Sequence, residues 1–298
     1  MLRAVPFQKI SIIGVGLLGG SIGLAVKRRK LALKVFGLVR NKAKLEACKK
    51  LCVADFFTGN LQQCVRDADL IILCTPISQM RPLVLRMLPA LKSGAILTDV
   101  GSVKSGVVRE LESLVQKNGV HFIGGHPMAG GEKAGVSAAR ENLFQNAVCV
   151  LTTTKRTNST ALKLLEQFWQ SLGARTLRLD AAQHDLLVSR ASHLPHVAAA
   201  TLASLVLDSK QPKQQAALCA AGFRDTTRIA SGSPEMWRDI VLANRKNVSQ
   251  SVDAFVAELK KFQTALKKSD GQAVEKFFAT AKTRRDGWCG KVNSTSSE

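Results

Sequence analysis

The sequence lacks a hydrophobic run long enough to cross a membrane. Its longest mostly apolar stretch, Leu194 to Leu207, is too short for a spanning helix and is interrupted by a proline and polar residues. A strand-like pattern begins by about Gln8, which leaves no room for a signal peptide. We therefore expect a cytoplasmic protein with no transmembrane helix and no membrane partner.

Paired cysteines are lacking as well. The seven cysteines form no C-x-x-C pair, and Cys74 and Cys149 lie inside apolar, strand-like runs. Cysteines in such runs behave as small buried hydrophobic residues. Neither a disulfide framework nor a zinc site follows, and no metal is predicted.

Acidic residues are scarce, and the formal net charge is +21. The first fifty residues hold twelve lysines and arginines against one acidic residue, Glu46. Such a balance raises the question of nucleic-acid binding. However, no helix-turn-helix, zinc finger or basic-aromatic motif accompanies the basic residues. An anionic cofactor and an anionic substrate explain the charge more simply, so no nucleic-acid partner is predicted.

The first half of the chain alternates β-branched runs with helical patterns, which is typical of a parallel sheet covered by helices. Beyond Thr154, long helical periodicities take over. The predicted fold class is α/β: a Rossmann-type doubly wound sheet in residues 1–153, joined near residues 152–159 to an all-α domain in residues 154–298. Strands are expected at Lys9–Ile13, Lys34–Val39, Leu70–Cys74, Ala95–Asp99, His121–Gly124 and Ala147–Thr152.

A glycine-rich turn of the form G-x-G-x-x-G follows the first predicted strand, and a helical pattern over Ser21 to Lys30 follows the turn. Backbone amides and a helix N-terminus in this arrangement face the pyrophosphate of a dinucleotide. An ordinary tight turn is the alternative. The predicted cofactor-binding residues of the turn are Gly14, Gly16, Leu17, Leu18 and Gly19.

The end of the second predicted strand lacks the acidic residue that usually binds the ribose hydroxyls of NAD. Val39 and Arg40 stand there instead, with Lys42 and Lys44 nearby. Arg40 could hold a 2′-phosphate, so NADP is favoured slightly over NAD. The alternative is that these are solvated residues at the start of a helix.

Polar residues follow other strands at the edge where a cofactor would lie. Thr75 and Pro76 close one strand, and Ser102 follows the next. Ser102 could cap a helix or point toward the nicotinamide. His126 follows a later strand and is expected on a loop, where its imidazole could accept a proton from a hydroxyl. Glu132 could orient the same site or lie on the surface.

The second half adds further candidates. His193 and His196 flank Pro195, which should begin or kink a helix. Arg228 could grip a substrate carboxylate through its guanidinium, or form an i, i+3 ion pair with Asp225. Trp237 could be a core aromatic residue.

A heptad-like stripe then runs along one long predicted helix and needs another helix to cover it. That partner could come from the same chain or from a second subunit, and we expect a homodimer through the C-terminal helices. The stripe consists of Val248, Val252, Phe255, Leu259, Phe262 and Leu266.

Taken in order and spacing, several of these segments resemble the prephenate/arogenate dehydrogenase family of tyrosine biosynthesis. The likeness runs from about residue 7 to 290. The segments are GVGLLGGSIGLA, TDVGSVK, GGHPMAGGE, SHLPH and FRDTTRIA, followed by Trp237.

The resemblance implies an oxidative decarboxylation in which hydride passes from a hydroxyl-bearing ring carbon to NAD(P)+ and carbon dioxide leaves as the ring aromatises. It implies catalytic roles for His126 and Ser102, and an ionic gating network of Glu132 and Asp225. It also implies substrate contacts from His193, His196, Arg228 and Trp237.

The implied substrate is prephenate; arogenate, or dual specificity, is the alternative. Two other classes remain open from the residues: another Rossmann-plus-helical hydroxyacid dehydrogenase, and a dinucleotide sensor without catalysis.

Overall fold

The computed structural model describes residues 7–131, 133–208 and 210–294 of the chain. The chain divides into two compact units after Asn244. Within the described residues, no helix combines the length and the apolar character that crossing a membrane requires.

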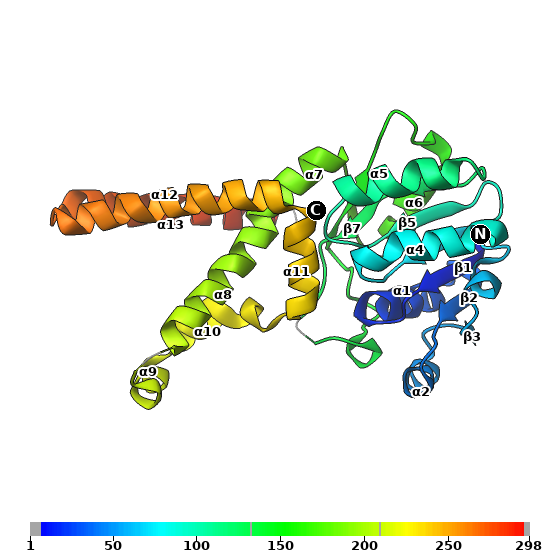
Figure 1. Cartoon of the computed structure of the whole chain (residues 1–298), viewed down its shortest axis with the longest axis horizontal. Coiled ribbons are helices and arrows are strands. Elements are labelled where there is room, and N and C mark those ends of the chain that lie inside the picture. The colour runs from blue at the N-terminus through cyan, green and yellow to red at the C-terminus, as the bar shows by residue number, and fades with distance from the viewer. Residues whose placement is uncertain (1–6, 132, 209, 295–298) are drawn as a thin grey trace. The chain divides into compact units, whose positions relative to one another are not determined.

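The first unit is built on a six-stranded, fully parallel sheet of order β3-β2-β1-β4-β5-β6 (Figure 1). The strand order reverses between β1 and β4, and in such sheets ligands bind at the carboxyl ends of the strands beside this reversal. The strands are β1 (Phe7–Ile13), β2 (Ala32–Leu38), β3 (Phe56–Thr58), β4 (Leu70–Leu73), β5 (Ile96–Asp99) and β6 (His121–Ile123).

Both faces of the sheet are covered by helices. In β4 the alternating side chains divide between two cores: Leu70 and Ile72 face one, and Ile71 and Leu73 face the other. Strands buried on both faces read as continuous apolar runs, which is why the sequence signal here was strong. The flanking helices are α1 (Leu17–Arg28), α2 (Lys42–Lys50), α3 (Leu61–Val65), α4 (Ile77–Met87) and α5 (Ser105–Gln116).

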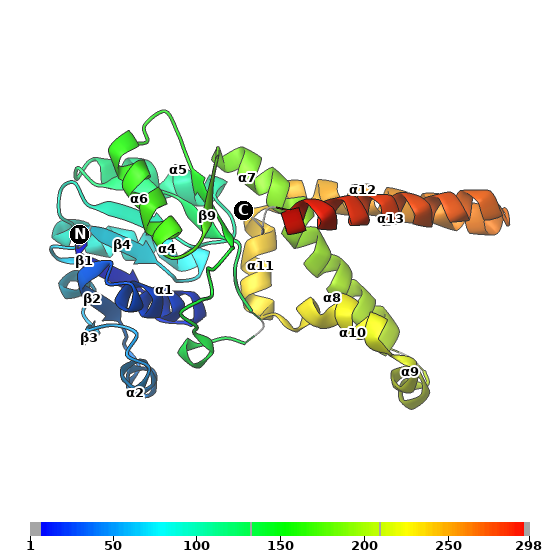
Figure 2. The same ribbon diagram turned by 180° about the vertical axis from the view of Figure 1, so that it is seen from behind.

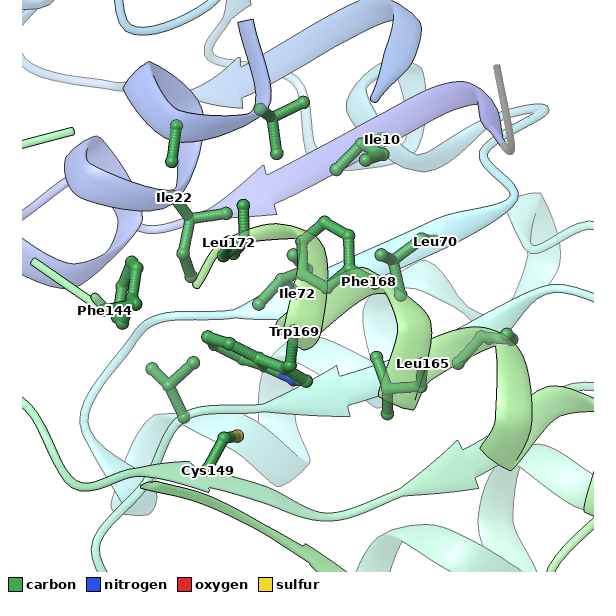
Figure 3. Close-up of a cluster of buried hydrophobic side chains, with 14 of the residues drawn as sticks. Ile10, Ile22, Leu70, Ile72, Phe144, Cys149, Leu165, Phe168, Trp169 and Leu172 are labelled. Carbon is green, nitrogen blue, oxygen red and sulfur yellow. The ribbon is translucent and has the colours of Figure 1, made fainter. Parts of the chain in front are cut away.

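Helix α6 (Ser159–Ser171) lies on the same face as α1 and comes to the front in Figure 2. Its Phe168 and Trp169 pack over Ile10 and Ile72 of the sheet (Figure 3). Trp169 is fully buried, so its replacement by alanine would cost about 3–5 kcal/mol.

A second, three-stranded sheet corrects the predicted strand arrangement. Its order is β7-β8-β9, comprising Gly125–Pro127, Val148–Thr152 and Arg175–Leu179. The sixth predicted strand is therefore β8 of this small sheet rather than part of the large one. Strands β3, β7 and β9 were not predicted from the sequence, because runs this short or this polar carry little hydrophobic pattern.

The α/β layers also continue past the expected joint at residues 152–159. Strand β9 pairs with β8, and α6 packs into the core of the large sheet, so these layers extend to Leu179. The helices that follow are α7 (Ala181–Val188), α8 (Leu194–Leu207), α9 (Pro212–Leu218), α10 (Ala221–Thr227) and α11 (Pro234–Ala243).

The second unit contains α12 (Arg245–Lys267) and α13 (Gly271–Ser294). All six residues of the predicted stripe lie on α12, which confirms the long helix. Part of the stripe is covered within the chain, since the rings of Phe262 and Phe277 lie 4.8 Å apart. Phe255, Leu259 and Leu266 stay exposed on α12.

Candidate active site

The glycine-rich turn has the shape of a phosphate cradle. Gly14 adopts a φ of +102°, and a Cβ there would lie 2.6 Å from the carbonyl oxygen of Cys74. A Cβ on Gly19 would lie 2.1 Å from the carbonyl oxygen of Gly14, so the helix can approach the strand only with glycine. Around Gly16 the space is open, and it brings no side chain to cap the first amides of α1. Those amides suit a pyrophosphate.

The start of α1 differs slightly from expectation. The helix begins at Leu17, not Ser21, so Leu17 and Leu18 lie in its first turn, where both are half-buried. Beside the cradle, the Thr75 Oγ1 atom is buried and bonds to no described residue, and Pro76 occupies the N-cap position of α4. A buried hydroxyl without a partner fits a site that a ligand completes.

Arg40 lies exposed just after β2. Asn41 caps α2 by accepting a hydrogen bond from the backbone N–H of Lys44 at 3.1 Å. The basic residues of this turn therefore lie at the start of α2, just past the carboxyl end of β2, and a helix N-terminus favours an anion.

His126 does not lie on a loop as predicted. It is the middle residue of β7, paired with Val150 of β8, and only 7% of it is exposed. Its strand is held against β5, because the backbone N–H of Gly125 donates to Asp99 Oδ1 at 3.2 Å. The prediction failed because three residues bounded by glycine and proline carry no strand pattern.

Behind His126 lies a buried chain of polar groups. Its Nδ1 is 2.8 Å from Nε2 of His184, and Nδ1 of His184 is 2.8 Å from Oδ1 of Asp185. Both His184 and Asp185 are buried on α7. The Asp185 carboxylate also accepts the backbone N–H groups of Lys104 at 2.7 Å and Ser105 at 2.9 Å.

Asp185 thus caps helix α5, and Ser102 does not. The helix begins at Ser105, with Lys104 at the N-cap position, so the capping alternative for Ser102 is wrong. The positive end of α5 and its amides favour the ionised carboxylate. Burial raises the pKa of Asp185, but the bonds from His184, Ser105 and Lys104 outweigh it and leave that pKa below its ordinary value.

A buried ion pair lies next to this chain. Lys104 Nζ bonds to the carboxylate of Asp99 at the end of β5, and both side chains are fully buried. Asp99 also accepts the backbone N–H of Gly101 at 2.8 Å. The pair therefore ties together the two backbone segments that carry Ser102 and His126.

These surroundings keep His126 neutral. Burial lowers the pKa of its imidazole well below the ordinary value, and the neighbouring His184, Lys104 and His193 lower it further. A neutral imidazole can accept a proton.

A second histidine reaches this cluster from the helical segment. His193 is fully buried at the end of a π-helical turn (Ser189–His193) between α7 and α8. Asn244 Nδ2 lies 3.2 Å from its Nδ1 and donates to the backbone carbonyl of Asp185 at 2.7 Å. Burial lowers the pKa of His193 to about 4. Its Nε2 makes no hydrogen bond to the described residues, so this buried donor is available to a ligand.

The remaining predicted substrate residues surround His196. Its ring stacks on Trp237 of α11 with centroids 3.8 Å apart, and Trp237 also meets His193 edge-on at 6.1 Å. Burial lowers the pKa of His196, and Arg228 lies close enough to lower it further. Arg228 lines a surface hollow together with Phe223 and Thr227. Pro195 lies in the first turn of α8, which confirms that it begins a helix.

The structure gives fewer contacts for three other predicted site residues. Asp225 is exposed on α10, and Glu132 lies outside the described residues. Ser102 is half-buried beside His193, whose pKa its backbone influences.

Several polar residues of this site were missed in the sequence. His184 and Asp185 lie on α7 and Asn244 follows the end of α11, with no motif around any of them. Asp99 and Lys104 were noticed only as part of TDVGSVK. Their signal is burial and mutual contact, which spacing along the chain does not reveal.

Comparison with known proteins gives the family. A profile of the prephenate dehydrogenase nucleotide-binding domain matches residues 22–178, and one of the prephenate dehydrogenase dimerization domain matches residues 180–282. The chain belongs to the prephenate dehydrogenase family. The predicted resemblance is confirmed, and the family places the chain among NAD(P)-dependent oxidoreductases.

Individual relatives agree with this assignment. The chain is 36% identical to prephenate dehydrogenase of Bacillus subtilis, over 93% of this chain and 75% of that protein. It is 33% identical to cyclohexadienyl dehydrogenase of Zymomonas mobilis, over 94% and 95%. The crystal structure of A. aeolicus prephenate dehydrogenase with hydroxyphenyl propionate and NAD+ matches with a TM-score of 0.88 and 29% identity, covering 96% of this chain and 99% of that one.

Proposed function

We propose that this protein is a prephenate dehydrogenase, which converts prephenate to 4-hydroxyphenylpyruvate and carbon dioxide. The observation that carries the proposal is the buried, neutral His126 at the carboxyl edge of the sheet. One of its ring nitrogens is held by His184, and the other makes no hydrogen bond within the described part of the chain. It is therefore available to a substrate hydroxyl.

His126 accepts the hydroxyl proton as the carbon bearing that hydroxyl loses a hydride. The bond from the ring to its carboxylate then breaks, carbon dioxide leaves, and the electron pair enters the ring, which becomes aromatic. The proton returns from His126 to the phenol oxygen, so His126 regains its starting state. The bound nicotinamide supplies the hydride acceptor. Ser102 assists at the hydroxyl from the loop after β5.

In this proposal the substrate is bound by residues of the helices that follow α7. A substrate with two carboxylates needs cations and donors, and Arg228 supplies the guanidinium while the buried Nε2 of His193 supplies a donor. His196 and Trp237 form the stacked wall. Asp225, with Glu132, belongs to the ionic network that gates the site in this proposal.

The cofactor is NADP or NAD, with NADP slightly favoured. Gly14, Gly16 and Gly19 hold the pyrophosphate, with Leu17, Leu18, Thr75 and Pro76 alongside. Arg40 holds the 2′-phosphate because it is an exposed cation where an acidic residue would otherwise bind the ribose.

The protein is a homodimer in this proposal. Exposed apolar side chains on α12 and α13, among them Leu259, Phe278 and Trp288, need cover. A dimerization-domain profile matches residues 180–282, which include α12 and the first half of α13. In this proposal the domain boundary moves from the expected joint at residues 152–159 to near Asp180, because the α/β layers run to Leu179 and the two profiles match residues 22–178 and 180–282.

The test is an assay of reduced nicotinamide at its absorbance maximum, with prephenate and arogenate each offered with NAD and NADP. Turnover of prephenate above arogenate supports the proposal. Preference for arogenate, or equal use of both, identifies the alternative arogenate or dual-specificity enzyme. Cofactor binding without turnover of either substrate would contradict the proposed function.

A further inference from the structure

The buried chain behind His126 ends in a group that can only accept hydrogen bonds. Asp185 receives three: from His184 Nδ1 at 2.8 Å, and from the backbone N–H groups of Lys104 and Ser105. The two amides carry fixed hydrogens, and they hold the carboxylate ionised at the positive end of α5. The hydrogen between Asp185 and His184 must therefore sit on His184 Nδ1.

The position of this hydrogen determines the direction of the hydrogen bond between His184 and His126. A neutral imidazole carries one N–H. With its hydrogen on Nδ1, His184 presents a lone pair on Nε2, which lies 2.8 Å from Nδ1 of His126. His126 must then carry its own hydrogen on Nδ1 to make that bond. Its Nε2 is left with a lone pair, which is the form that a proton acceptor needs.

We propose that His184 and Asp185 are positioning residues that fix the tautomer and the ring orientation of His126, so that its Nε2 faces the substrate as an acceptor. This inference rests on the proposed role of His126. The opposite polarity would make His126 Nε2 a donor and would block proton acceptance. Other charged or titratable groups near the ring, namely Lys104, His193 and, through Lys104, Asp99, do not bond to Nδ1 of His126.

The tautomer can be read directly by imidazole 1H–15N correlation spectra of the full-length protein labelled with 15N-histidine. The five histidines can be assigned by single substitutions. We expect His126 and His184 both in the Nδ1–H form at pH 7.5 without substrate. An Nε2–H form of His126 would overturn the proposal whatever the activity. The expected tautomers without turnover would support the relay and would count against the proposed function instead.

Two substitutions of His184 test its contacts with Asp185 and with His126 separately by enzyme kinetics. His184→Asn keeps a donor near the Nδ1 position for Asp185 but loses the acceptor for His126. His184→Gln places an amide oxygen near the Nε2 position. We expect His184→Asn to lower kcat about 10- to 100-fold, with substrate KM and cofactor Kd within about twofold. His184→Gln should be at least about fivefold more active than His184→Asn, because its oxygen still accepts from His126.

His121→Gln is the control. His121 lies on β6 and is half-buried, outside the polar chain; this variant should match the wild type in kcat and Tm. An unchanged kcat in His184→Asn would overturn the proposal. So would equal losses in both His184 variants accompanied by a fall in Tm that His121→Gln lacks, because that pattern indicates a role in packing only.

Discussion

The two sides of the candidate site differ in whether their polar side chains already have partners within the protein. On the side behind His126, the buried side chains of His184 and Asp185 bond to each other, and the buried Lys104 side chain bonds to Asp99. On the substrate side, Arg228 is exposed and the buried Nε2 of His193 has no partner among the described residues.

The difference separates two kinds of function. A satisfied buried network holds its groups in one arrangement before any ligand arrives. A buried donor that bonds to no described residue, such as Nε2 of His193, gains a partner when a ligand binds. Substitutions behind His126 should therefore change stability or turnover, and those on the substrate side should change affinity.

The largest expected effect is on the buried ion pair. Lys104→Met leaves the Asp99 carboxylate buried without its cation, so the free energy of unfolding should fall by about 3–5 kcal/mol. The matched control is Lys92→Met, which breaks an exposed pair with Asp69 at 2.6 Å and should cost at most about 1 kcal/mol. Urea denaturation measures both. Equal losses would remove the distinction between buried and exposed pairs.

Next is the proton acceptor itself. His126→Asn keeps a polar side chain but removes the ring nitrogen that faces the substrate. We expect kcat to fall by a factor on the order of 10² or more, with cofactor affinity little changed. Steady-state kinetics and cofactor titration measure the two quantities. A variant with wild-type turnover would exclude His126 as the proton acceptor.

The residues changed in these two substitutions also show which parts of the fold and the site can be predicted from sequence. The large sheet, the cradle and the helical second half follow from hydrophobic period and glycine spacing, because those signals are local. His126 and His193 could be singled out as candidates by their motifs. The polar chain behind His126 depends on contacts between distant segments: Lys104 and Asp185 are 81 positions apart, and His126 and His184 are 58 apart. No local pattern predicts such contacts. The strand of His126 was missed for a different reason, because its three residues are too few to carry a strand pattern.

On the substrate side, Arg228→Ala should act on affinity. Losing one charge-assisted hydrogen bond to a carboxylate should raise the substrate KM about 10-fold or more while kcat changes little. Arg238→Ala is a suitable control, since that exposed guanidinium is already paired with Asp239 at 2.8 Å. If Arg228→Ala left KM unchanged, Arg228 would have a structural role only.

Arg40→Asp tests the other exposed cation. Removing the positive charge and adding a carboxylate should repel a 2′-phosphate, so the KM for NADP should rise about 10-fold while that for NAD stays level or falls. The two cofactors act as controls for each other in the same preparation. A parallel loss with both would mean that Arg40 does not discriminate between them.

The smallest effect concerns pH and the buried side of the site. His126 is active when neutral, and its lowered pKa keeps it neutral until the pH falls well below the ordinary imidazole value of about 6.5. Activity should thus be lost only as the pH falls through that lowered pKa. Between pH 8 and 6.5, kcat/KM should change by less than about twofold, and the acid limb should lie below 6.5. Short initial-rate assays across this range measure it. An acid limb centred at or above 6.5 would indicate that the ring behaves as an exposed histidine, contrary to its burial behind Lys104 and His184.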